Sequence, residues 1–249
     1  MSEESKNQDQ IDVDINLENT VDSAAKDEPV PEEVSTFRLV ATLAVAGALA
    51  GLLIVLVNLH TKPIIDKWKA EQLQLAVYEV LPGVERYDTF YLVNDELSAE
   101  LPSGAKESEF KRVYVGRDEK GETTGVAISR GESGFQDVIM VIFGHDPVSG
   151  KVSGMKILDS KETPGLGDKI FKDMDFVDQF FAGPETPLLG VKAGAGKGQP
   201  NEIDMITGAT ISSKAVIQII NNAMAEWKPV LDKGIPRAPV ETVSAEEAP

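Results

Sequence analysis

The stretch DVIMVIFGHDPVSGKVSGMKIL, residues 137–158, decides the fold expected for the main domain of this chain. Two short runs rich in Val and Ile, 137–143 and 151–158, flank the turn-prone sequence GHDPVSG. A connection this short joins antiparallel neighbours, because a parallel crossover needs roughly a dozen residues or more. The stretch therefore predicts a β-hairpin within an antiparallel sheet.

Further elements are expected on both sides of this hairpin. RVYVGR (112–117) and TGVAISR (124–130) are two more strands, separated by the turn-prone RDEKGE. A helix over 63–81 would use a mostly apolar face, and the last helix would span about 211–227, with Pro229 just beyond its end. FKDMDFVDQFF reads as a short helix, and 183–203 as a long Gly- and Pro-rich loop. The fold class is thus α+β, with flanking helices. The apolar face of the first helix comprises Ile65, Trp68, Leu73, Ala76, Val77 and Val80.

A long uncharged segment, LVATLAVAGALAGLLIVLVNL, covers residues 39–59. As a helix it would be about 31 Å long, enough to cross a bilayer. It starts too far from Met1 for an ordinary cleaved signal peptide, so we expect a retained signal anchor over 38–60. The alternative, a buried core helix, would need protein around its whole circumference. Arg38 precedes the span and Lys62, Lys67 and Lys69 follow it, so the flanking charges by themselves predict a cytoplasmic main domain.

The composition excludes several classes of function. The net charge of −17 argues against nucleic-acid binding, which needs a basic face. The chain has no cysteine and only two histidines, His60 and His145, so cysteine-ligated clusters and multi-histidine metal sites are not expected. Any redox chemistry would need an organic cofactor. Residues 1–34 hold eleven acidic residues and two lysines and are expected to be disordered, and 234–249 form a polar tail after a domain over 63–233.

The stretch DMITGATISSKAV (204–216) places four hydroxyl side chains where a loop becomes a helix. The open amides of a helix N-terminus attract anions, above all phosphate. The simpler alternative is an N-cap, in which Thr or Ser satisfies those amides. A nucleophilic role in hydrolysis is not expected, because no histidine base lies nearby in the sequence. Thr210 is instead a candidate for a phosphoester made by another enzyme.

Two other glycine-containing loops are candidate ligand sites. In SKETPGLGDK (160–169), Pro and Gly force a non-repetitive backbone that would lie flat against a ligand; the alternative is a plain connection. GVKAGAGKGQ (190–199) lacks the spacing of a phosphate-binding P-loop and is expected to be a flexible loop. His145, without partner ligands at useful spacing, is expected to be an exposed turn residue.

KETPGLGDK followed by DMITGATISSKAV, after a single N-terminal span, resembles the G subunit of the Rnf ion-translocating electron-transport complex. More distantly it is similar to the C subunit of the sodium-pumping NADH:quinone reductase. Both belong to the FMN-binding domain family, and the resemblance covers roughly residues 38–230. It implies one FMN-binding domain after the membrane anchor.

The resemblance implies specific residues for the cofactor. FMN would be joined through its phosphate to Thr210, with Thr207, Gly208 and Ala209 completing the motif and Asp204 beginning the stretch that a flavin transferase reads. The loop residues Glu162, Thr163, Leu166 and Gly167 would border the flavin. The family's glycine-aromatic strand is only partly matched, because Phe135 and Gln136 replace part of it. No catalytic residue and no metal ligand are implied.

The function implied is that of an electron-carrying flavoprotein subunit, with covalent flavin, rather than a stand-alone enzyme. Its partners would be the other subunits of an Rnf-type complex and a flavin transferase that uses FAD. The family places its flavin domain on the outer, periplasmic side of the cytoplasmic membrane, against the charge count. The alternatives are the C subunit of the sodium-pumping reductase and a cofactor-free, membrane-tethered binding or scaffold domain.

Overall fold

The computed structural model describes residues 35–237, which fall into two compact units, one ending at Thr61 and the other beginning at Lys62. The expected tail over 1–34, and the tail beyond 237, lie outside the described residues. Helix α1, Thr36–Val80, contributes to both units. It has a mean hydropathy of 2.7 over its most apolar window and, within the described chain, is the one helix long and apolar enough to cross a membrane.

Helix α1 runs through Pro63, whereas the sequence predicted a separate helix beginning there. Proline keeps a helical φ but removes one amide hydrogen bond, and its ring crowds the carbonyl four residues earlier, so the helix continues through Pro63 at a cost in stability. The apolar face predicted for residues 63–81 is only partly buried. Ala76, Val77 and Val80 are buried, but Ile65 and Trp68 are exposed because the sheet contacts only the last turns of α1.

The second unit contains a six-stranded antiparallel sheet in the order β2-β1-β3-β4-β5-β6. The predicted hairpin is confirmed: β5 pairs with β6 in a register that sets Phe143 opposite Met155. The strand predicted at 112–117 is β3, but β1 and β2 were not predicted. The strands are β1 Arg86–Val93, β2 Glu96–Ser98, β3 Arg112–Arg117, β4 Thr123–Ser133, β5 Val138–Asp146 and β6 Lys151–Asp159, with a short 3-10 helix at Glu107–Glu109.

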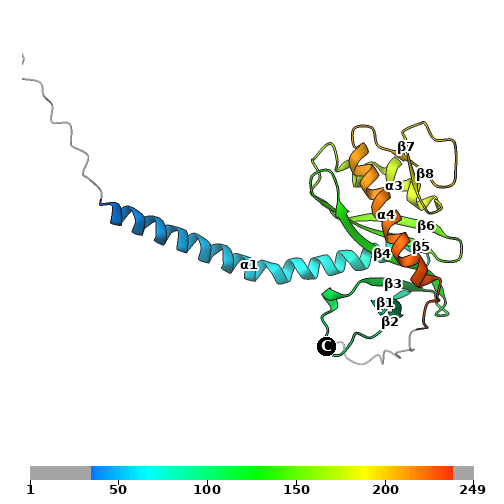
Figure 1. Cartoon of the computed structure of the whole chain (residues 1–249), viewed down its shortest axis with the longest axis horizontal. Coiled ribbons are helices and arrows are strands. Elements are labelled where there is room, and N and C mark those ends of the chain that lie inside the picture. Colours follow the sequence, from blue (N-terminus) through cyan, green and yellow to red (C-terminus); the bar gives the residue numbers. More distant parts are fainter. Residues whose placement is uncertain (1–34, 238–249) are drawn as a thin grey trace, which may run out of the picture. The chain divides into compact units, whose positions relative to one another are not determined.

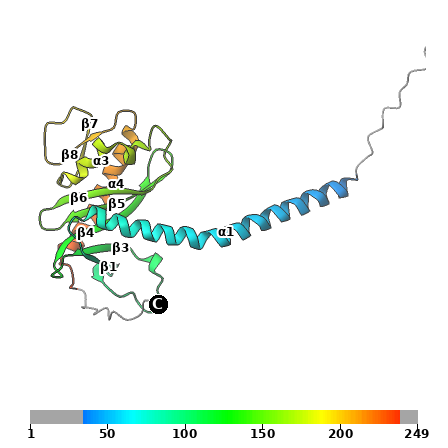
Figure 2. The ribbon, with the colours of Figure 1, turned by 180° about the vertical axis from the view of Figure 1, so that it is seen from behind.

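Both faces of the sheet centre are covered by helices. Val141 and Phe143 of β5 join the core beneath α4, while Ile142 between them packs with Val77 and Val80 of α1. Figure 1 shows α4 lying across one face, and Figure 2, from behind, shows the last turns of α1 on the other. Because successive strand residues point to opposite faces, two covered faces explain the uninterrupted apolar run of β5.

The C-terminal elements differ from the predicted ones in two respects. The stretch 183–203 is not a loop throughout: β7, Leu189–Lys192, pairs in parallel with β8, Glu202–Met205. Helix α4, Thr210–Leu231, continues past Pro229 because Val230 and Leu231 are buried in the core and Asp232 N still bonds to Lys228 O. The predicted short helix forms as α2, Lys169–Lys172, and α3, Met174–Phe181.

His145 lies inside β5 rather than in an exposed turn, so that prediction was wrong. Its side chain is buried, and no described residue bonds to Nδ1. Burial lowers the pKa of His145, although Asp146 opposes the shift. The residue is thus a neutral part of the sheet, and the hairpin turn begins after it.

Candidate functional site

The turn that leads into α4 is formed by residues 206–209. Its backbone closes through a hydrogen bond of 3.1 Å from Ala209 N to Ile206 O. Gly208 has a φ of +84°, in the left-handed region that side chains disfavour. A glycine at this position therefore lets β8 reverse directly into the first turn of α4.

The N-terminus of α4 carries no side-chain cap, so the capping alternative was wrong. The N-cap residue is Ala209, and the nearby serine hydroxyls bond elsewhere. Ser213 Oγ accepts from Ile206 N at 3.2 Å and donates to Ala209 O at 2.9 Å. Among the described residues, none accepts a hydrogen bond from the amides of Thr210, Ile211 or Ser212. Three adjacent amides at the positive end of the helix dipole thus lack an acceptor among the described residues, which is the environment that favours an anion.

Thr210 is exposed at this helix end. Its Oγ1 donates to Ile206 O at 3.3 Å, near the long limit for a hydroxyl hydrogen bond. Thr207, also exposed, lies on the other side of Gly208 in the turn. The hydroxyl of Thr210 is therefore accessible and lies on the first residue of the helix, beside the open amides.

A buried carboxylate joins the loop 160–168 to this helix. Glu162 Oε2 accepts a hydrogen bond of 2.6 Å from Ser212 Oγ, two residues after Thr210. Its Oε1 accepts from the amides of Phe135 and Gln136 at 2.8 and 3.0 Å. Burial by itself raises the pKa of Glu162, but these hydrogen bonds outweigh it and hold the pKa below its ordinary value. Glu162 is therefore an ionised connection between three segments.

Two glycines leave the space that this carboxylate occupies. A Cβ on Gly167 would lie 2.8 Å from Ser212 Oγ and closer still to Glu162 Oε2. A Cβ on Gly134 would overlap Glu162 Oε1 and Ile139. Gly167 was expected to border a flavin; in the structure its lack of a side chain serves the contact between Glu162 and Ser212.

The structure brings the two motifs found in the sequence together at this point. Thr163 Oγ1 donates to Gln136 Oε1 at 2.7 Å, and Leu166 N bonds to Thr163 O, so the loop folds back on itself. Leu166 is 53% exposed, and two more apolar side chains of the joined segments are exposed as well. The three exposed apolar side chains are Phe135, Leu166 and Ile211. They are available to cover a flat ligand. The hydrogen bonds that the backbone amides of residues 135 and 136 donate to Glu162 were not evident from the sequence, because a backbone amide is present whatever the side-chain type.

Asp204 lies on the opposite side of the turn, in β8. The side chain of Gln179 in α3 bonds to the backbone of Asp204. The Oδ1 of Asp204 is buried and has no hydrogen-bond partner in the described chain. A hollow of about 490 Å³ is lined by Asp204, Thr207 and Gln179, among others. Nothing local in the sequence signals Gln179, since its partner is 25 residues away.

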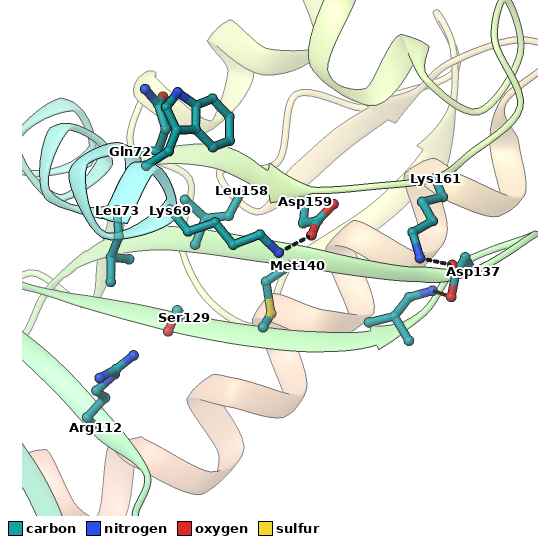
Figure 3. Close-up of a pocket in the computed structure, with 12 residues that line it drawn as sticks. Lys69, Gln72, Leu73, Arg112, Ser129, Asp137, Met140, Leu158, Asp159 and Lys161 are labelled. Carbon is teal, nitrogen blue, oxygen red and sulfur yellow. Dashed lines mark hydrogen bonds and ion pairs between the residues drawn. The ribbon is translucent and has the colours of Figure 1, made fainter. Parts of the chain in front are cut away.

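A separate groove of about 310 Å³ lies between the last turns of α1 and the sheet (Figure 3). Its charged side chains are largely paired, Lys69 with Asp159 at 3.0 Å and Lys161 with Asp137 at 3.2 Å. None of the residues expected to hold a cofactor lines it. The groove is therefore distinct from the site at the α4 N-terminus.

Comparison with known proteins gives consistent results. Residues 134–225 match the family model described as FMN-binding domain, a range that includes both loops of the site. The chain is 33% identical over 193 residues to the G subunit of the Na(+)-translocating ferredoxin:NAD(+) oxidoreductase complex of Acetobacterium woodii, covering 77% of this chain and 91% of that protein. It is 30% identical to the G subunit of the ion-translocating oxidoreductase complex of Escherichia coli K12, covering 73% and 86%.

A solved structure shares the fold. The crystal structure of NqrC from Shewanella oneidensis superposes with a TM-score of 0.55 at 15% identity, over 68% of this chain and all of that one. At this identity the likeness concerns the fold alone. The fold expected from the sequence, an antiparallel sheet with flanking helices after an apolar N-terminal helix, is thereby confirmed.

Proposed function

Because the chain belongs to the family of G subunits of ion-translocating oxidoreductase complexes, we propose that it carries electrons on FMN esterified through its phosphate to Thr210. The relatives and the FMN-binding domain support the coarser statement directly: the chain is an FMN flavoprotein of such a complex. The covalent bond to Thr210 is the finer part of the proposal.

One observation carries the choice of Thr210. Its exposed hydroxyl is on the first residue of α4, next to three backbone amides that no described side chain caps. A phosphate esterified there would lie against the positive end of a long helix, in the environment that favours an anion. Thr207 lies in the turn before the helix, so the same argument does not favour it.

The attachment is a group transfer in which Thr210 is the acceptor. Its Oγ1 forms a bond to the FMN phosphorus of FAD, the phosphoanhydride bond breaks, and AMP leaves as the hydroxyl proton is lost. No described histidine lies beside Thr210, so a separate flavin transferase would supply the base. Asp204, Thr207, Gly208 and Ala209 would present the acceptor to that enzyme.

The bound flavin supplies reversible electron transfer, and the chain positions and shields it. Leu166 and the loop residues Thr163 and Gly167 would border the ring, and Glu162 would act behind them by fixing the loop on α4. The protein would relay electrons between other subunits of the complex. Those subunits, and the transferase, are the partners that we propose.

The anchor and its side complete the proposal. The chain has one candidate membrane helix within its described residues, and we propose that the flavin domain lies on the outer side of the cytoplasmic membrane. The flanking lysines favour the opposite side, but their excess is small, and other membrane subunits can dictate orientation. The relatives, which are named as G subunits, favour this function over that of the C subunit of the sodium-pumping reductase. The FMN-binding domain argues against the cofactor-free scaffold.

Substitution of the acceptor tests the proposal. Thr210→Ala should abolish covalent flavin without loss of folded protein, because only the exposed hydroxyl and its methyl group are removed. The readouts are flavin fluorescence in a denaturing gel and the mass of the peptide that contains residue 210, with Ser103→Ala, an exposed hydroxyl outside the motif, as the control that keeps its flavin. Flavin that persists on Thr210→Ala, or that is found on Thr207, would reject the assignment.

A further inference from the structure

The acidic residue that opens the attachment motif is held by a side chain from another element. Asp204 N donates to Gln179 Oε1 at 2.6 Å, and Gln179 Nε2 donates to Asp204 O at 3.2 Å. Both backbone hydrogen-bonding groups of one residue are thus taken by one side-chain amide. Such a pair imitates the contact that a neighbouring strand would make.

This contact replaces a strand that the small sheet lacks. Among the described residues β8 pairs with β7 alone, with Val191 opposite Asp204. The other edge of β8 at Asp204 is occupied by Gln179. Helix α3, which carries it, is anchored by two buried aromatic side chains, Phe176 and Phe180, with ring centroids 5.3 Å apart. Gln179 therefore ties the strand before the motif to a fixed part of the core.

The position of Asp204 matters for the residues that follow it. Only the five residues 205–209 separate Asp204 from Thr210 at the end of the motif, and Asp204, Gln179 and Thr207 line the same hollow. An enzyme that reads this stretch must bind it in one conformation, and a stretch held in that conformation beforehand binds with a smaller loss of entropy. Gln179 itself lies outside the stretch 204–210, so its contact would act on presentation rather than on chemistry.

We propose that Gln179 is a positioning residue for flavin attachment: its amide holds the backbone of Asp204 and so presents residues 204–210 to the flavin transferase. This inference rests on the function proposed above. In this role Gln179 contacts neither the acceptor hydroxyl of Thr210 nor the flavin. Loss of the side chain should weaken recognition of the protein and leave the transfer step itself nearly unchanged.

The test follows flavin attachment to the full-length protein in detergent, with purified flavin transferase and FAD. Gln179→Ala should raise the KM for the protein substrate roughly tenfold, the effect of losing about two neutral hydrogen bonds, with kcat changed less than twofold. Gln179→Glu keeps an acceptor for Asp204 N but has no donor for Asp204 O, so its KM should fall between those of Gln179→Ala and the wild type. Gln218→Ala, on the exposed face of α4, is the matched control and should behave as wild type.

Melting temperatures distinguish a loss of transferase recognition from a loss of folded stability. The variants with a raised KM should melt within a few degrees of wild type. A wild-type KM in Gln179→Ala, or a loss confined to kcat, would overturn the role of Gln179. If Gln179→Ala does not fold, Gln179→Glu decides: a raised KM supports the role and a wild-type KM overturns it. A wild-type protein that takes no flavin at Thr210 would overturn the proposed function, and this inference with it.

Discussion

At the scale of single residues, Glu162 is the group on which the candidate site most depends. It is 5% exposed, yet its lowered pKa keeps it ionised at neutral pH, because three hydrogen-bond donors from two other segments converge on it. A buried carboxylate with this many donors contributes stability only as long as it is charged. The hydrogen bonds that hold the site together therefore depend on pH through the ionisation of Glu162.

Glu162→Gln should lower the free energy of unfolding by about 2 kcal/mol at pH 7, since an amide cannot replace all the charge-assisted hydrogen bonds. Because the folded-state pKa is depressed, this stabilisation is present above the ordinary value of 4.5 and is lost as the pH falls through the folded-state pKa. Denaturant unfolding of both proteins from pH 7 to pH 3 measures the difference, with exposed Glu119→Gln as the control. A difference that does not shrink in acid would contradict the ionised state of Glu162.

At the scale of elements, the loop 160–168 and the first turn of α4 behave as one structural unit. Glu162 and Ser212 join them, and Gly167 provides the close approach that the joint needs. Gly165, in the same loop, has a different role: its φ is +78° and nothing would meet an added Cβ. One glycine is thus required by packing and the other by backbone conformation.

Gly167→Ala should separate Glu162 from Ser212 and lower the free energy of unfolding by about 2 kcal/mol, as overpacking does. Flavin should still attach at Thr210, because residues 204–210 are unchanged, but its midpoint potential should shift as the loop moves away from α4. Gly165→Ala is the comparison: it should cost about 1 kcal/mol through its left-handed φ and shift the potential less. Redox titration decides, and equal potentials in wild type and Gly167→Ala would show that the joint does not influence the flavin.

At the scale of the whole molecule, labelling of an introduced thiol tests the proposed position of the second unit on the outer side of the membrane. The chain contains no cysteine, so a single introduced thiol reports on one position alone. Val148, at the turn of the hairpin, is 93% exposed and suits this purpose. A cysteine at Ser160, in the loop 160–168, would be less suitable, because Ser160 is half-buried and its Oγ accepts a hydrogen bond from Glu162 N.

Val148→Cys should react with a membrane-impermeant maleimide in intact cells, after permeabilisation of an outer membrane where the host has one. Ser35→Cys, which precedes the apolar segment, is the control and should react only after lysis. This outcome follows if the second unit is on the outer side and α1 crosses the membrane once. The reverse labelling pattern would mean that the lysines after the span had set the orientation.

The sequence by itself determined the features that depend on local pattern. The apolar length of residues 39–59, the hairpin at 137–158 and the existence of a helix after Thr210 follow from periodicity, turn chemistry and composition. The resemblance carried by ETPGLG and TGAT also identified the family, which the relatives confirm. These features require no knowledge of which segments meet.

Only the tertiary structure decided the features that depend on contacts between distant segments. The burial of His145, the pairing of β7 with β8 and the extension of α4 past Pro229 all go against local signals, because packing against the core outweighs local propensity. The roles of Glu162, Gly167 and Gln179 likewise depend on partners far away in the sequence, Ser212 for the first two and Asp204 for the third. A hydrogen bond or a steric limit is defined by the position of both partners, and the fold alone brings them within reach.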